Sequence, residues 1–372
     1  MPASNPALAA PTARASFLAA LPPTRFRAMR RPLAGAIVTL ALFAMLLLVA
    51  TAIGYRPPAT APAADAGDVA AYGRIVERMR AGEGYYSAAH AELRQGGFGT
   101  QSVFNWRLPT LSWIESRLPS LLWANVLLGI AALAALLAAA KFVAASADRT
   151  TGMRVMPALI LSLIACTTPA AAFFTEIVAG VLILASVAAY GLKRPAAGFV
   201  IALLALFIRE LAAPYVIVCV ALAWRDRRFV ELGAWAAGLA AFAAYFAWHA
   251  AMVQATLGAG DLAYPDGWVQ FGGLGFILAT AKFNGAFIAA PLWATAILMP
   301  LCLLGLAAWQ GAGARRVALT VAAYLVAFVV VGKPFNTYWG ALYTPLMMIG
   351  LAFVPAALRD LFAALRADGK AA

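Results

Sequence analysis

The first candidates for chemistry in this sequence are the ionisable residues of one long polar segment near its start. Residues 55–118 separate apolar runs at 33–54 and 121–140, whereas almost every later connection between apolar runs is short. Loops of membrane proteins are usually plain connectors, so we expect binding or catalysis in one that is long, charged and aromatic. Its charged residues include Asp68, Arg74, Glu77, Arg78, Glu83, Glu92 and Arg107.

A second candidate is the pair Arg209 and Glu210, which interrupts the apolar segment 195–224. Each arm of a hairpin there would have about fourteen residues, or roughly 21 Å of helix against a hydrocarbon core of about 30 Å. The turn would then lie below the membrane surface, where ionisable groups are costly and usually functional. A self-satisfied Arg–Glu pair, or one tilted helix with a snorkelling arginine, are the structural alternatives.

The composition indicates the solvent around these residues. Hydrophobic residues make up 64% of the chain and charged residues 12%, with a mean hydropathy of +0.84. These values are far from those of a soluble fold, so we predict an all-α, polytopic bundle of transmembrane helices. The net charge of +13 does not indicate a nucleic-acid partner, because the Lys and Arg residues fall in small groups between apolar runs.

Those basic groups predict a topology by the positive-inside rule. If each group faces the cytoplasm, the chain crosses the membrane about ten times, with both termini inside and the loop 55–118 outside. We predict a cytoplasmic tail over residues 1–32 and one integral membrane domain over 33–372. The first apolar run resembles a signal peptide in its basic flank, but about twenty apolar residues favour a retained anchor.

Helical periodicity within the loop places Asp68. Apolar residues recur at helical spacing from Val69 to Met79 and are followed by Gly82, which predicts a helix from Asp68 to the residues before that glycine. Asp68 is then expected at the N-cap, where its carboxylate accepts backbone N–H bonds, and this is the structural alternative to a chemical role. A second short helix is predicted over residues 87–95.

Two later segments carry residues expected on the outer side. The segment 271–284 is apolar but broken by glycines and ends near Lys282, so we predict an interfacial or re-entrant helix. Lys333 and Tyr338 lie in the outer loop 332–340. Such residues usually anchor a protein at the membrane interface, and binding of a phosphate or a sugar ring is the functional alternative.

Several kinds of site are not indicated. Cys166, Cys219 and Cys302 lie in apolar runs without paired spacing, and the histidines are His90 and His249. The sequence therefore predicts neither a disulfide framework nor a zinc site. No HExxH motif and no phosphate-binding P-loop is present, which argues against ATP-driven transport within this chain.

The order of motifs along the chain resembles that of a known superfamily. An N-terminal anchor precedes an outer loop that contains Asp68 and Tyr72, and the loop continues through Gly82, Gly84, Tyr85, Tyr86, Pro109 and Pro119. Phe174-Thr175-Glu176 opens the fourth predicted span, and Arg209 lies at the tip of a short hairpin. This layout resembles the GT-C superfamily of membrane glycosyltransferases, which includes protein O-mannosyltransferases and aminoarabinose transferases.

The resemblance implies transfer of a sugar from a polyprenyl-phosphate donor to an acceptor at the periplasmic side of a bacterial inner membrane. It implies an essential acidic residue in the first outer loop, for which Asp68 is the candidate base that takes the proton of the acceptor hydroxyl. Cations stabilise the departing phosphate in such a reaction. The substrate-binding candidates are Arg209, Glu210, Arg107, Glu176, Tyr72, Lys282, Lys333 and Tyr338.

The chain departs from the superfamily in one local feature. The first loop of those enzymes often carries an acidic pair, whereas Gly67 and Val69 flank Asp68 here and Asp65 is the nearest second carboxylate. No cofactor is firmly implied, although Asp65, Asp68 and Glu176 offer oxygen ligands of the kind a divalent cation prefers. The sugar, the acceptor and the oligomeric state stay open.

Two other functions remain alternatives. A transporter or flippase for a lipid-linked saccharide would use Arg209 and Glu210 equally well, because discontinuous helices form substrate sites near the membrane midplane. Against it, the chain has no clear internal repeat. A non-catalytic subunit of a membrane assembly is the third possibility.

Overall fold

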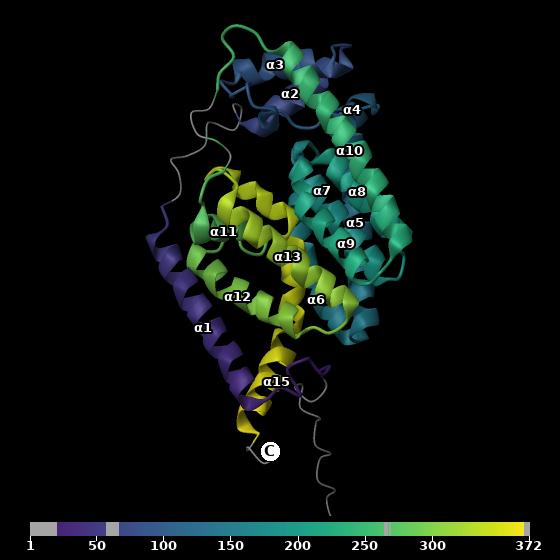
Figure 1. Cartoon of the computed structure of the whole chain (residues 1–372). Helices are drawn as coiled ribbons and strands as arrows, with labels where there is room; N and C mark the ends of the chain where they lie inside the picture. The colour runs from purple at the N-terminus through teal and green to yellow at the C-terminus, as the bar shows by residue number, and fades with distance from the viewer. Residues whose placement is uncertain (1–20, 57–66, 264–266, 268, 368–372) are drawn as a thin grey trace, which may run out of the picture.

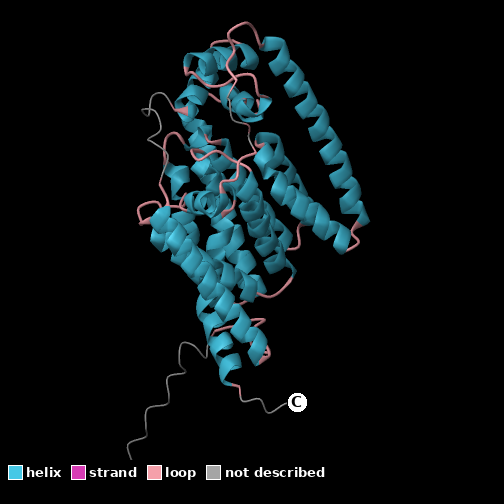
Figure 2. Cartoon of the chain, turned by 60° about the vertical axis from the view of Figure 1, so that its left-hand side comes forward, coloured by secondary structure: helices cyan, strands magenta, loops and turns pink. Residues whose placement is uncertain are grey.

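The computed structural model describes residues 21–56, 67–263, 267 and 269–367, which fold as helices joined by turns (Figure 1, Figure 2). Within these ranges there is no β-strand, and one isolated bridge pairs Val269 with Val331. The all-α class predicted from the composition is therefore confirmed.

The helices form a larger bundle and a cap above it (Figure 1). We call it the outer cap, because the topology predicted from the sequence places it outside. The outer cap consists of α2 (Asp68–Arg80), α3 (Tyr85–Gln95), η2 (Val103–Asn105) and α4 (Thr110–Arg117). The first half of the bundle consists of α1 (Arg31–Gly54), α5 (Leu121–Ser146), α6 (Arg149–Leu163), η3 (Ile164–Thr167), η4 (Ala171–Phe173), α7 (Thr175–Gly191), α8 (Pro195–Ile208), η5 (Glu210–Ala212) and α9 (Ala213–Arg225). The second half consists of α10 (Phe229–Thr256), α11 (Gly273–Ala281), α12 (Leu292–Ala308), α13 (Ala312–Val330), η6 (Asn336–Leu342), α14 (Thr344–Ile349), η7 (Gly350–Phe353) and α15 (Val354–Arg366).

Six helical segments of the described chain are long and apolar enough to cross a membrane: α1, α5, Arg149–Thr167, α10, α13 and Thr344–Arg366. These helices suggest a membrane protein, as the composition predicted. Each of the other four segments predicted to cross is also helical but shorter, with 17 residues in α7 and α12, 14 in α8 and 13 in α9. The number of crossings therefore stays a prediction.

The segment between α8 and α9 is broken at Arg209, as the short-hairpin interpretation predicts. α8 ends at Ile208, and Arg209 has extended backbone angles of φ −146° and ψ 116° before the turn η5 begins. Pro214 lies in the first turn of α9, where a missing N–H is harmless, whereas within a continuous helix its ring would clash with the carbonyl of Glu210. The interpretation of residues 195–224 as one continuous tilted helix is therefore wrong.

The outer cap packs onto the bundle through its own apolar cluster. Aromatic side chains of α2, α3 and the segment before α4 are buried together with Val253 near the end of α10; they include Tyr72, Tyr85, Tyr86 and Trp106. The cap is therefore held directly on the outer end of α10 (Figure 1).

The loop after α10 is also tied to the cap, through Asp261. One carboxylate oxygen accepts hydrogen bonds from the Thr100 hydroxyl (2.6 Å) and from Nε2 of His90 (2.8 Å), and the other accepts the N–H of Gly258 (2.6 Å). The loop is thus fixed to α3 and to the turn that follows it.

The described ends of the chain lie together on the side opposite the cap (Figure 1). Both the N–H and the hydroxyl of Thr24 donate to Oδ2 of Asp360 in α15, at 2.8 and 2.9 Å. Because both ends lie on one side, the arrangement agrees with an even number of crossings.

The helix boundaries in the cap differ slightly from those predicted. The N-cap of α2 is Gly67, and Asp68 is the first helical residue, so the prediction that Asp68 caps this helix is wrong by one position. The end of α2 is confirmed, since Gly82 has φ +100° and donates its N–H to Met79, a conformation that glycine adopts without steric cost. α3 begins at Tyr85, two residues earlier than predicted, because Gly84 is its N-cap.

Candidate functional site

Four of the residues singled out in the sequence meet beneath the outer cap. Nη2 of Arg209 lies 2.9 Å from Oε1 of Glu176, and its Nη1 lies 2.9 Å from Oε1 of Glu210. Nη2 of Arg107 lies 3.9 Å from Oε2 of Glu176. We call these four residues, Arg107, Glu176, Arg209 and Glu210, the ionic network.

Local structure explains how each element presents its side chain. Glu176 lies in the first turn of α7, where a carboxylate is favoured by the positive end of the helix dipole. Its Oε2 also accepts a hydrogen bond of 3.1 Å from the hydroxyl of Thr175. Arg209 and Glu210 lie at the break between α8 and α9, so both reach the network from a helix end.

Arg107 is held in place by the outer cap. Its guanidinium carbon lies 4.2 Å from the centre of the Tyr72 ring, and the Tyr72 hydroxyl accepts the N–H of Arg107 at 3.0 Å. The hydroxyl of Tyr85 donates to the carbonyl of Arg107. Nη1 of Arg107 donates to the carbonyl of Phe173 at 2.8 Å. Arg107 therefore joins α2 and α3 to the segment that leads into α7.

The ionic network is almost completely removed from solvent. Glu176 is 0% exposed, Arg107 and Arg209 are each 4% exposed, and the side chain of Glu210 is 17% exposed. The two guanidinium and two carboxylate charges cancel formally, which is the condition for burying charges at tolerable cost. The self-satisfied pair expected as a structural alternative is thus present, but within a larger set of four residues.

The hydrogen bonding of this network is incomplete within the described structure. Nε of Arg209 and Oε2 of Glu210 are both buried and have no hydrogen-bond partner among the described residues. Buried polar atoms ordinarily have a partner, which includes water or a bound ligand. The geometry therefore provides one donor suited to an oxyanion and one acceptor suited to a hydroxyl.

The predicted base, Asp68, belongs to the helix that covers the network. It is the first residue of α2 and lies one helical turn, about 6 Å along the axis, before Tyr72. Tyr72 contacts Arg107 through its ring and its hydroxyl, whereas the side chain of Asp68 lies outside the described structure. Asp65 lies outside the described residues altogether.

The loop that contains Lys333 and Tyr338 borders the network. The rings of Tyr338 and Phe174 meet edge to face at 5.7 Å, and Nδ2 of Asn336 donates to the Tyr338 hydroxyl at 3.1 Å. Lys333 is 5% exposed and Trp339 2% exposed. Lys333 is too buried to act as a surface anchor at a membrane interface, so that interpretation is wrong for this residue.

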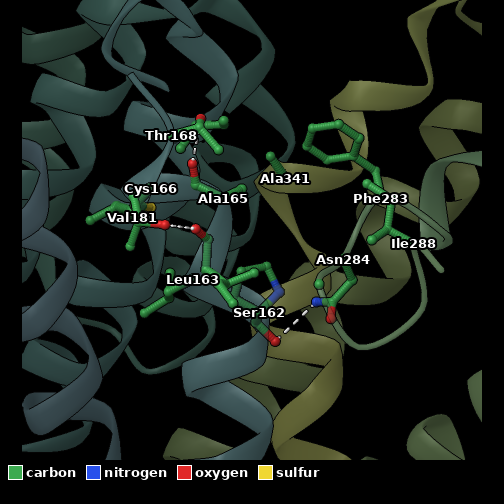
Figure 3. Close-up of a pocket in the computed structure, with 15 residues that line it drawn as sticks. Ser162, Leu163, Ala165, Cys166, Thr168, Val181, Phe283, Asn284, Ile288 and Ala341 are labelled. Carbon is green, nitrogen blue, oxygen red and sulfur yellow. Dashed lines mark hydrogen bonds between the residues drawn. The ribbon is translucent and has the colours of Figure 1, made fainter. Parts of the chain in front are cut away.

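Lys282 lies elsewhere, at the end of α11 and next to Phe283, which lines an apolar pocket (Figure 3). The pocket has a volume of about 300 Å³ and lies between α6, η3, α7 and the segment before α12. Asn284 donates to the hydroxyl of Ser162 across one edge of it, at 2.9 Å. Ile177 also lines the pocket, so the pocket and Glu176 share the first turn of α7.

The cap also buries an ionisable residue that the sequence does not single out. Glu115 in α4 is 2% exposed and forms part of the buried face of that helix. No sequence signal distinguishes it, because a two-turn helix with residues of every type does not indicate which side faces inward.

A metal site finds little support in the described part of the chain. No group of three or more His, Cys, Asp or Glu residues there is arranged to hold a metal ion.

Comparisons of the chain with protein-family models, with curated proteins and with solved structures find no match. Function must therefore be inferred from the geometry of the ionic network.

Proposed function

We propose that this chain is a GT-C-like membrane glycosyltransferase that moves a sugar from a polyprenyl-phosphate donor to an acceptor at the periplasmic side. The observation that carries the proposal is the buried ionic network beneath α2. Two guanidinium groups, Arg107 and Arg209, converge there on Glu176. Arg107 also packs on the ring of Tyr72, one helical turn after Asp68 in α2.

The arginines suit the phosphate of such a donor. Planar guanidinium groups bind phosphate oxygens through paired, charge-assisted hydrogen bonds. Arg209 has a buried Nε without an acceptor among the described residues, so a phosphate oxygen there would complete its hydrogen bonding. Stabilising the developing charge on the departing phosphate is the main electrostatic task in this transfer.

Asp68 would act as the general base in this scheme. It takes the proton of the acceptor hydroxyl as the oxygen attacks the sugar carbon, and the bond from that carbon to the phosphate oxygen breaks. The phosphate leaves as an anion that the arginines stabilise. Tyr338, beside Phe174, is the candidate for packing against the sugar ring.

The apolar pocket suits the lipid part of the donor. Its lining is mostly hydrocarbon, and it includes Ile177, the residue after Glu176. Hydrophobic pockets with a few polar groups at one side are the usual form of small-ligand sites. The polyprenyl chain would lie there with its phosphate directed toward the network.

The setting we propose is a bacterial inner membrane, crossed about ten times, with both termini in the cytoplasm. The grouping of both described chain ends opposite the outer cap supports this topology. Membrane lipids and the lipid-linked donor are the proposed partners.

The test uses the purified protein and a labelled donor, and it measures both donor binding and the release of polyprenyl phosphate. Arg209→Ala should lose most donor binding, and Arg209→Lys should retain part of it, because an ammonium keeps the charge without the fork. Arg117→Ala, which removes an exposed arginine of α4, is the matched control. Normal donor binding by Arg209→Ala would make the network a structural feature only.

One observation favours a transporter as the second candidate. The chain is broken between α8 and α9, and broken helices of this kind form substrate sites in transporters. Movement of a labelled lipid-linked saccharide across proteoliposomes, without release of polyprenyl phosphate, would favour this function over sugar transfer.

A further inference from the structure

Glu115 is a carboxyl group of the outer cap that is buried without an ion-pair partner among the described residues, unlike Glu92, which pairs with Arg74 and Arg78. On α4 the buried residues are Leu111, Ser112 and Glu115, whereas Trp113 and Ile114 are 40% and 44% exposed. A glutamate on a short surface helix normally faces solvent, because its charge is costly to bury. Here the register of the helix turns it inward, leaving it 2% exposed.

The surroundings of Glu115 offer it few partners. Its Oε1 is buried and has no hydrogen-bond partner among the described residues. The helix packs against α2, α5 and α8, and its Thr110 and Trp113 contact Tyr245 and Trp248 of α10, neither of which is a charged group. α8 has no charged residue, and the first charged residue of α5 is Lys141, near its far end.

The charged groups of α2 and α4 are engaged elsewhere. Arg80 donates to the carbonyls of the two residues after α4, and Arg117 is exposed. Of the other charged side chains of α2 that the structure describes, Arg74 and Arg78 are both paired with Glu92, and Glu77 is exposed. The cation whose charge acts on Glu115 is Arg107, on the segment that leads into α4.

Burial decides the ionisation of this carboxyl group. It raises the pKa of Glu115 to about 8, and the nearby charge of Arg107 only partly opposes it. At neutral pH Glu115 therefore carries a proton. The charges of Arg107 and Arg209 then balance those of Glu176 and Glu210, whereas ionised Glu115 adds a third negative charge that interacts with Arg107.

We propose that Glu115 is a proton-binding residue that controls anion binding at the ionic network. When Glu115 is protonated it does not attract the guanidinium of Arg107, which then interacts with Glu176 and with a bound phosphate. When it releases its proton to water, the new carboxylate competes with the phosphate for Arg107. The inference rests on the proposed function only in taking a lipid phosphate as the anion.

Infrared spectra of the full-length protein in nanodiscs test the proton site by itself. A protonated carboxyl group has a C=O band distinct from that of a carboxylate. The band should be present at pH 7, disappear as the pH rises through about 8, and be missing in Glu115→Gln. Glu77→Gln, at an exposed position, should keep it. A wild-type spectrum without this band at pH 7, or an unchanged band in Glu115→Gln, would overturn the proposal.

Binding of a polyprenyl monophosphate at pH 7 and pH 9 tests the coupling. With a pKa of about 8, the protonated fraction falls from about 0.9 at pH 7 to about 0.09 at pH 9, so the apparent Kd should rise about tenfold. Glu115→Gln, which mimics the neutral acid, reports the change due to the ionisation of the ligand alone. Equal pH dependence in both proteins would refute the coupling. Absence of binding at either pH, in both proteins, would refute the proposed function as well, while the infrared band decides the proton site separately.

Discussion

Removing one charge of the Arg209–Glu176 pair should destabilise the protein severely. The two groups are 4% and 0% exposed and 2.9 Å apart. At an effective dielectric constant of about 20, their attraction is roughly 6 kcal/mol, against about 4 kcal/mol for Arg107 at 3.9 Å. Desolvation offsets much of this gain, but loss of one partner leaves the other charge buried and poorly compensated.

The expected cost of Arg209→Ala is therefore about 3–5 kcal/mol in the free energy of unfolding, and that of Glu176→Ala is similar. The double substitution removes both charges, so its cost should be about 2–3 kcal/mol smaller than the sum of the two.

Reversible unfolding in mixed micelles, followed by the fluorescence of the ten tryptophans, measures these free energies. Arg117→Ala, at an exposed position, should cost less than about 0.5 kcal/mol. If the cost of the double substitution equals the sum of the two single costs, the charges do not depend on each other. A cost below about 1 kcal/mol for Arg209→Ala would also refute the view that they depend on each other.

Three further predictions concern the topology and the packing around the site. A cysteine introduced at Ser87 in the outer cap should react with an impermeant thiol reagent added outside, whereas one at Ala312, on the side predicted to be cytoplasmic, should not. Both positions are exposed, so a difference in reaction reports the side of the membrane. Labelling of both from the same side would contradict the topology. Asp261→Asn should destabilise the cap by about 1–3 kcal/mol, measured as faster proteolysis of the loop after α10; a rate equal to that of the wild type would contradict this. Although burial raises it, three hydrogen-bond donors lower the pKa of Asp261 to about 2. The ionised carboxylate therefore stabilises the fold above about pH 4, and this contribution to stability should disappear as the pH falls toward 2. Gly305→Ala should cost about 1–3 kcal/mol or more, because a Cβ atom there would lie 1.9 Å from the carbonyl oxygen of Gly350; unchanged thermal stability would show that the two backbones are not in contact.

The features that could be predicted from the sequence are those set by local chemistry. The end of α2 follows from Gly82, and the break at Arg209 follows from apolar arms too short to cross a membrane. The start of α2 was misplaced by one residue, since Asp68 is a strong N-cap by propensity but Gly67 takes that position here.

The contacts that could not be predicted are those between distant parts of the chain. Arg107 and Glu176 were both candidates, but their meeting depends on how the cap packs on α7. The burial of Glu115 depends on which side of a two-turn helix faces inward. The bond between His90 and Asp261 joins residues 171 positions apart, beyond the reach of any periodic pattern.

Asp68→Asn is the decisive test of sugar transfer with Asp68 as the general base. Because Asp68 is the first residue of α2 rather than its N-cap, the substitution should cost at most about 1 kcal/mol, from a weaker interaction with the helix dipole. The measurement is the rate at which labelled polyprenyl phosphate is released from the donor, beside donor binding by the same protein. We expect normal expression and normal donor binding, with the rate of transfer reduced roughly a hundredfold or more, the scale of general-base catalysis. Transfer by Asp68→Asn at nearly the wild-type rate would contradict this expectation.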